Sequence, residues 1–138
     1  MPSRHKNKTF ATLLATVTGG IGLHRFYLRG PADKWGWVHL ASIPVTLLVL
    51  WLGIGQHGLF QAAALVLSVL IGCLEALVLG LIPDDKWDQQ FNPDSGKQTN
   101  SRWWLALLLV ITLAVGATGL IATLARGFDL LFTGGAFG

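Results

Sequence analysis

The sequence predicts an all-α fold: an integral membrane helical bundle of four apolar helices, the first of them short. Residues 59–82 form an apolar run of 24 residues with a single charge, Glu75. At about 1.5 Å per residue, this run exceeds the roughly 30 Å hydrocarbon core of a bilayer. Only 12% of the residues are charged, and the mean hydropathy is +0.56. Because soluble domains carry about 25% charged residues, composition and pattern agree on a membrane protein.

The apolar segments follow one another along the whole chain: residues 9–23, 36–53, 59–82 and 103–125. The first has only 15 residues, so a spanning helix and a re-entrant half-helix both stay open. The second contains Pro44, which predicts a kink. A glycine-rich turn at 53–58 leads into the third segment. We therefore divide the chain into a helical hairpin at 1–58 and two further helices at 59–138.

Two stretches outside these segments are polar or mixed in character. Residues 83–102 predict a surface loop with a short helical turn from Asp84 to Phe91. The tail, 126–138, keeps aromatic and aliphatic residues beside glycines and predicts a short interfacial segment. Tryptophans occur where membrane boundaries are expected, namely at positions 35, 37, 51, 103 and 104.

The positions of lysine and arginine predict the orientation in the membrane. Three lie before the first apolar segment, three in the first loop, three in the third loop and one in the tail. If the first segment spans, placing the first and third loops inside gives six positive residues inside against four outside. If it does not span, the split is nine against one. Both alternatives place these two loops in the cytoplasm.

Small residues at a four-residue step predict a helix–helix contact in the third segment. The stripe consists of Ser68, Gly72, Ala76 and Gly80. Lipid tails provide no hydrophobic drive between helices, so close approach relies on residues of this size. Ala11, Ala15 and Gly19 repeat the same step in the first segment.

Glu75 lies beside that stripe, deep in an apolar helix, where a charged carboxylate is costly. One interpretation is a structural acid that is neutral or bonded to a neighbouring helix. The other is a proton or cation site. His39 and Arg25 are the candidate partners, and no other intramembrane acid or base is expected to complete a relay.

The sequence contains none of the common catalytic or cofactor motifs, so we expect no enzymatic activity and no cofactor. Cys73, inside the third segment, is interpreted as a packing residue. Two alternatives are less favoured. One is a haem bound by His24 and His39, and the other is a metal site formed by Asp84, Asp85 and Asp88. The basic residues form no nucleic-acid face, so no nucleic-acid partner is expected.

The stretch 19–28, with the sequence Gly-Gly-Ile-Gly-Leu-His-Arg-Phe-Tyr-Leu, resembles the hallmark of the TM2-domain family of small membrane proteins. The basic residues at 6–8 resemble its lead-in, and residues 75–92 resemble an extension in bacterial relatives. The resemblance implies a helix pair joined by a short cytoplasmic loop, hence a spanning first segment. It also implies no established enzymatic activity. His24 stands where the family also carries an acid.

The same turn is a candidate contact site for another protein or for a lipid headgroup, through His24, Arg25, Phe26 and Tyr27. Arginine can bind phosphate, and the aromatic rings suit the interface. We therefore expect a multi-pass, non-catalytic protein of the bacterial inner (cytoplasmic) membrane. Its role would be an accessory, scaffold or partner-binding subunit, with the bilayer and other membrane subunits or itself as partners. The alternative is a small oligomeric proton or ion pore, or transporter, using Glu75.

Overall fold

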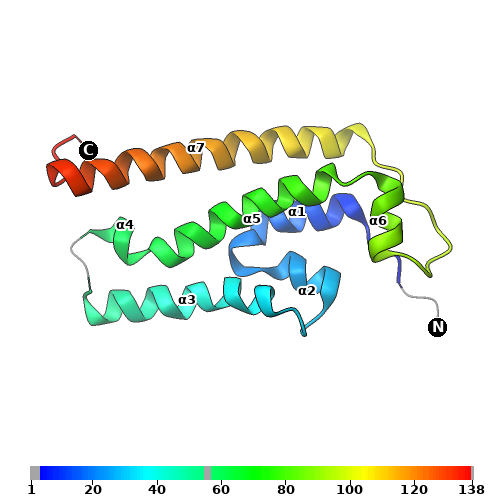
Figure 1. The fold of residues 1–138 in the computed structure, drawn as a ribbon, viewed down its shortest axis with the longest axis horizontal. Coiled ribbons are helices and arrows are strands. Elements are labelled where there is room, and N and C mark those ends of the chain that lie inside the picture. The colour runs from blue at the N-terminus through cyan, green and yellow to red at the C-terminus, as the bar shows by residue number, and fades with distance from the viewer. Residues whose placement is uncertain (1–3, 55–56, 138) are drawn as a thin grey trace.

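The computed structural model describes residues 4–54 and 57–137, and within these ranges the chain is helical without strands. Figure 1 shows α3, α5 and α7 lying side by side along the long axis, with α5 between the other two. The hairpin of α1 and α2 packs against one end of this layer, beside α6. The all-α prediction is therefore confirmed for the described residues.

The first apolar segment forms a half-length hairpin. Helix α1 (Lys8–Thr18) begins at Asn7, whose side chain accepts a hydrogen bond from the Phe10 amide. It ends in a 3₁₀ turn, η1 (Gly19–Ile21), and α2 (Leu23–Arg29) then runs back toward the end where α1 began. The expected helix over 9–23 therefore stops at Thr18, because three glycines follow within four residues.

Gly22 makes this reversal possible. Its φ of 75° lies in the left-handed region, and a Cβ there would be 2.8 Å from the carbonyl oxygen of Gly36. Glycine is therefore required both for the turn and for the close approach of α3.

Helix α3 (Lys34–Leu52) begins at Asp33, which caps the Trp35 amide, and ends at Gly53 with φ 64°. The expected kink residue, Pro44, lies inside it. Residues 55–56 of the expected turn lie outside the described residues. The third apolar segment is interrupted early: a short α4 (Gly58–Gln61) precedes α5 (Ala63–Leu81).

The loop at 83–102 contains a complete helix, α6 (Asp84–Phe91), rather than a single turn. It is amphipathic, and its Trp87 and Phe91 are buried against Ala11 and Leu28 of the hairpin. The Trp87 indole donates to the carbonyl of Lys6 over 3.1 Å. This helix therefore closes the polar end of the bundle instead of lying free on the surface.

The tail expected from Arg126 is helical over most of its length, because α7 (Trp103–Thr133) continues as one helix of 31 residues. Arg126 pairs with Asp129 over 2.5 Å, one helical turn away, and Asp129 in turn accepts from Thr133. These charges are satisfied within the helix itself, so they do not end it. Gly134, with φ 69°, ends it instead.

Three of the described helices, α3, α5 and α7, are long and apolar enough to cross a membrane. The 19 residues of α3 and α5 correspond to about 28 Å each, and those of α7 to about 46 Å. Helix α1, at about 16 Å, reaches only half as far. The prediction of four helices thus becomes three of spanning length and one half-length hairpin.

The small-residue stripe of α5 lies at helix contacts. A Cβ at Gly72 would be 2.5 Å from the carbonyl carbon of Gly19, so the two backbones touch. Ala76 is fully buried, and a Cβ at Gly80 would lie 2.5 Å from Leu109 of α7. Ser68, at the other end of the stripe, donates to the carbonyl of Gly20 over 2.7 Å. Since Gly72 is the middle residue of α5, the hairpin turn reaches the middle of that helix.

Candidate functional site

The site is a buried ionic cluster around Glu75 of α5, facing the first turn of α2. The Nε of Arg25 lies 3.0 Å from both carboxylate oxygens, and its Nη2 forms a second bond to Oε1. This two-pronged contact is the strongest geometry for an arginine–carboxylate pair. Nη1 of the same guanidinium pairs with Asp33 over 3.3 Å. The side chains of Arg25 and Glu75 are only 19% and 17% exposed.

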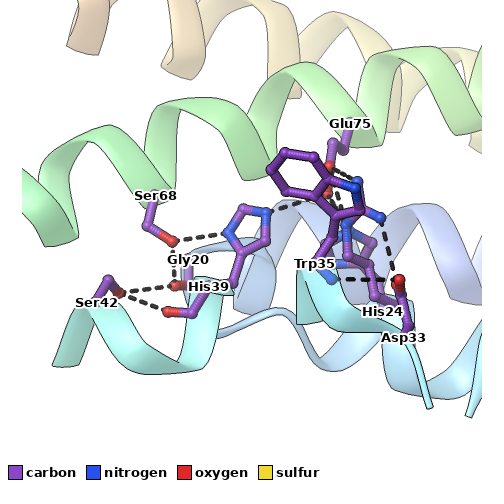
Figure 2. A network of polar contacts seen from close by, with 9 residues as sticks. Gly20, His24, Asp33, Trp35, His39, Ser42, Ser68 and Glu75 are labelled. Atoms are coloured by element: carbon purple, nitrogen blue, oxygen red, sulfur yellow. Dashed lines mark hydrogen bonds and ion pairs between the residues drawn. The ribbon is translucent and has the colours of Figure 1, made fainter. Parts of the chain in front are cut away.

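Two histidines complete the cluster, one from each neighbouring helix. The Nε2 of His24, in α2, lies 2.6 Å from Oε2 of Glu75, and the Nε2 of His39, in α3, lies 3.5 Å from the same oxygen. Both rings are almost fully buried, and their centroids are 6.1 Å apart. Figure 2 shows His39 between Ser68 and Glu75, with His24 approaching the carboxylate from the α2 side.

The hydrogen bonds assign the tautomer of His39. Ser68 has one hydroxyl proton, and the carbonyl of Gly20, 2.7 Å away, can only accept. The contact between Ser68 Oγ and His39 Nδ1, also 2.7 Å, must then take its proton from the imidazole. A neutral His39 therefore turns an unprotonated Nε2 toward Glu75. A proton on either partner would turn this repulsive contact into an attractive one.

His24 has the opposite arrangement. Its Nε2 donates to Glu75, whereas its Nδ1 is buried without a hydrogen-bond partner. The ring itself is 1% exposed. Thr46 Oγ1, further along α3, is the other buried side-chain polar atom without a partner among the described residues. Since such groups are rare, each marks a place where an additional polar ligand or water would be favourable.

Two cavities meet at the Arg25–Glu75 pair. The larger, about 550 Å³, lies between α3 and α5 and is lined mainly by apolar side chains such as Val38, Val45 and Leu67. The smaller, about 160 Å³, lies between α2, α5 and α6, where His24 and Arg29 line it with Phe91. The ion pair thus separates an apolar groove from a smaller cavity nearer the polar end.

The predicted contact turn is used mostly inside the molecule. Arg25 forms ion pairs with Glu75 and Asp33, and His24 bonds to Glu75. The Phe26 ring packs against Gly36 and lies 5.4 Å from the Trp37 ring. The Tyr27 hydroxyl accepts from the Asn7 amide over 3.0 Å. All four side chains therefore hold the hairpin in place.

A second polar network joins the N-terminal segment to α6 and to the loop that follows it. Lys8 pairs with Asp84 over 2.9 Å, and Ser101 donates to the same carboxylate. Asp88 accepts from Thr99 and Asn92. Burial raises the pKa of each of these aspartates, but the donated hydrogen bonds outweigh it and hold both pKa values below the ordinary range.

The sequence identified Glu75 and two of its partners, but it missed His24 and Asp33 as members of the cluster. The sequence named only His39 and Arg25 as partners of Glu75, so the contact of His24 with this carboxylate is the main difference. Its cause is the depth of the hairpin, because a turn assumed to lie at the surface instead reaches the middle of α5. The one available signal was the His-Arg pair directly after a glycine turn that permits close packing.

The described residues contain no group of three or more His, Cys, Asp or Glu side chains arranged to hold a metal ion. No family model, curated protein or solved structure matches the chain. Chemically, the Glu75 carboxylate is a buried charge that Arg25 neutralises. A proton can also move between this carboxylate and the two imidazoles. The function is therefore inferred from this cluster and from the surfaces around it.

Proposed function

We propose that this chain is a non-catalytic, multi-pass protein of the bacterial cytoplasmic membrane that acts as a scaffold or partner-binding subunit. The observation that carries this proposal is the internal pairing of Glu75. Its carboxylate is bonded by Arg25 and His24 and thus ties the hairpin to α5. A carboxylate saturated in this way supports the architecture, whereas a cation site requires carboxylate oxygens that are free to bind.

The orientation of the chain in the membrane follows from the half-length hairpin. The N-terminal segment, the loop before α3, α6 and the loop after it belong to one end of the bundle (Figure 1). Nine of the ten lysines and arginines lie in these segments, in α2 or at the first residue of α1 or α3, and only Arg126 lies toward the other end. The positive-inside rule then places this polar end in the cytoplasm, with α3, α5 and α7 crossing the bilayer.

The TM2-domain resemblance supports the same class of function, and membership in that family is part of the proposal. One feature departs from the family description. Helix α1 re-enters from the cytoplasmic side, whereas the family resemblance implies a spanning helix. The Gly-Gly-Ile-Gly stretch and the His24–Arg25 pair would then serve the re-entrant turn.

The surface for a partner is the polar end built from α6 and residues 92–102. This is where the chain exposes acidic, basic and amide side chains together, including Asp85, Lys86 and Lys97. The remaining surface is dominated by exposed apolar side chains on α3, α5 and α7, which suits contact with lipid.

Site-specific photocrosslinking in intact membranes tests the partner surface. A photoreactive residue at Lys97 should give one defined protein adduct. The same residue at Leu113, on the exposed face of α7, should give lipid adducts only. Equal protein adducts at both positions, or none at Lys97, would contradict the scaffold.

A second candidate function, a proton pathway, is favoured by one observation: the two cavities meet at Glu75, beside two imidazoles. Liposomes with an imposed pH gradient separate the two proposals. A scaffold should leave proton flux at the level of empty liposomes. A pathway should give flux that Glu75→Gln abolishes and that Asp129→Asn, at the opposite end, leaves unchanged.

A further inference from the structure

We propose that the cavity between α2, α5 and α6 binds the phosphate of an anionic bilayer lipid, with Arg29 as the principal cation. This inference rests on the membrane placement proposed above. It also assigns the lipid contact to a different arginine from the one the sequence suggested.

Arg25 is not free to bind an anion, because its guanidinium is shared between Glu75 and Asp33. Arg29, one turn later in α2, is exposed, and its side chain makes no hydrogen bond or ion pair with any described residue. The carbonyl end of α2 does not require it either, because the Lys6 ammonium already bonds the carbonyl of Leu28. Arg29 is therefore an uncompensated cation at the rim of a cavity.

The cavity lining matches an anion. Its formally charged residues are Arg25, Arg29 and Glu75, which leave one positive charge in excess. His24 also lines the cavity, and its Nδ1 is a buried atom without a partner. The volume of about 160 Å³ is large enough for a phosphate group.

The surroundings favour a lipid over a soluble anion. Leu28, Leu79 and Phe91 form apolar walls, and Val78 at the rim is 58% exposed. Leu74 and Leu81, one turn to either side on α5, are 60% and 71% exposed. A phosphate held at Arg29 can therefore extend its acyl chains along this exposed face of α5. The site lies at the end of the bundle that carries the cations, where phosphate headgroups are expected.

Native mass spectrometry of the purified full chain tests the site. The protein is equilibrated in micelles with equal amounts of phosphatidylglycerol and phosphatidylcholine, and the lipids retained are counted. We expect the wild type to retain one phosphatidylglycerol, with a preference of about fivefold or more over phosphatidylcholine. Arg29→Gln should lose that preference. Lys97→Gln, which removes an exposed cation from the same end, should keep it.

A second variant tests the cavity without changing any charge. Val78→Trp places a large ring at its rim and should abolish the preference as Arg29→Gln does. If either variant retains phosphatidylglycerol like the wild type, the lipid site is overturned. Displacement of the lipid by millimolar inorganic phosphate would also overturn it, in favour of a soluble anion site. A chain that inserts and folds but shows no preference refutes this site alone, whereas failure to insert refutes the proposed function.

Discussion

The two sides of α5 are joined to their neighbours by different kinds of interaction. On the side of the hairpin and α3, the contact combines touching glycine backbones with the ionic cluster of Glu75, Arg25 and the two histidines. On the side of α7, no side-chain hydrogen bond or ion pair with α5 forms within the described residues. There the contact consists of small residues against apolar side chains, such as Gly80 against Leu109.

This difference teaches where sequence changes should be costly. A buried charge that loses its partner keeps its full desolvation cost, whereas an apolar contact in lipid can be replaced by contact with lipid tails. We therefore expect a substitution on the hairpin side to lower the free energy of unfolding by about 2 to 3 kcal/mol. On the α7 side, we expect a change of less than about 1 kcal/mol.

The largest effect is expected for Arg25→Met, which leaves the Glu75 carboxylate without its cation. Because both side chains keep some exposure, we expect the free energy of unfolding to fall by about 3 kcal/mol. This value is near the lower end of the range for buried ion pairs that lose one partner. Reversible unfolding in mixed detergent micelles measures it. The double variant Arg25→Met/Glu75→Leu removes both charges and should recover more than half of the loss. A double variant less stable than the single one would show that the pair is not the origin of the effect.

A slightly smaller effect is expected for Gly72→Ala. The added Cβ would meet the Gly19 backbone at 2.5 Å, and neither helix can yield without separating, so we expect a loss of about 2 kcal/mol. Gly127→Ala in α7 is the matched control, since a Cβ there meets nothing within 4 Å. The control should stabilise the helix by up to about 1 kcal/mol. Equal effects at the two glycines would refute the close contact.

Acid should loosen the polar end before it affects the helices. Because folding lowers the pKa values of Asp84 and Asp88, their stabilisation is complete above the ordinary value, about 4, and is lost as the pH falls through the lower folded values. Hydrogen-exchange protection of the 92–101 loop, corrected for intrinsic rates, should fall in that window. Asp84→Asn should reduce protection already at neutral pH, whereas Asp94→Asn should not. A loop whose protection does not change with acid would contradict these assignments.

The smallest effect is expected on the α7 side, for Gly119→Ala. The new Cβ would lie 3.6 Å from Leu70, an ordinary contact distance, so stability should change by less than about 0.5 kcal/mol. The same unfolding assay measures it beside Gly72→Ala. A loss as large as that at Gly72 would remove the contrast between the two sides of α5.

The long apolar helices were predictable because length and hydropathy alone determine them. Helix α5 and most of α7 follow from their apolar runs, and the stripe from Ser68 to Gly80 follows from its spacing. The continuation of α7 past Arg126 was not predictable from hydropathy, because the Arg126–Asp129 pair satisfies its charges locally.

The site was predictable only in part. Glu75 stands out as a lone acid in an apolar run, but its partners are residues 24, 25 and 39, far away in sequence. Their meeting depends on the depth of the hairpin, which the glycines at 19, 20 and 22 permit but do not specify. Short segments such as 9–23 are compatible with both a spanning and a re-entrant path, and the re-entrant path that we propose rests on tertiary contacts with α5.

Cysteine labelling of the two ends of the bundle tests the central claim, the re-entrant hairpin, most directly. In a Cys73→Ser background, single cysteines replace Arg4, Lys97 and Phe137, and intact cells with a permeabilised outer membrane receive a maleimide that cannot cross the inner one. We expect labelling at position 137 and protection at positions 4 and 97 until the inner membrane is opened. Labelling at position 4 together with protection at position 97 would show that the first segment spans the bilayer, and the half-length hairpin would be wrong.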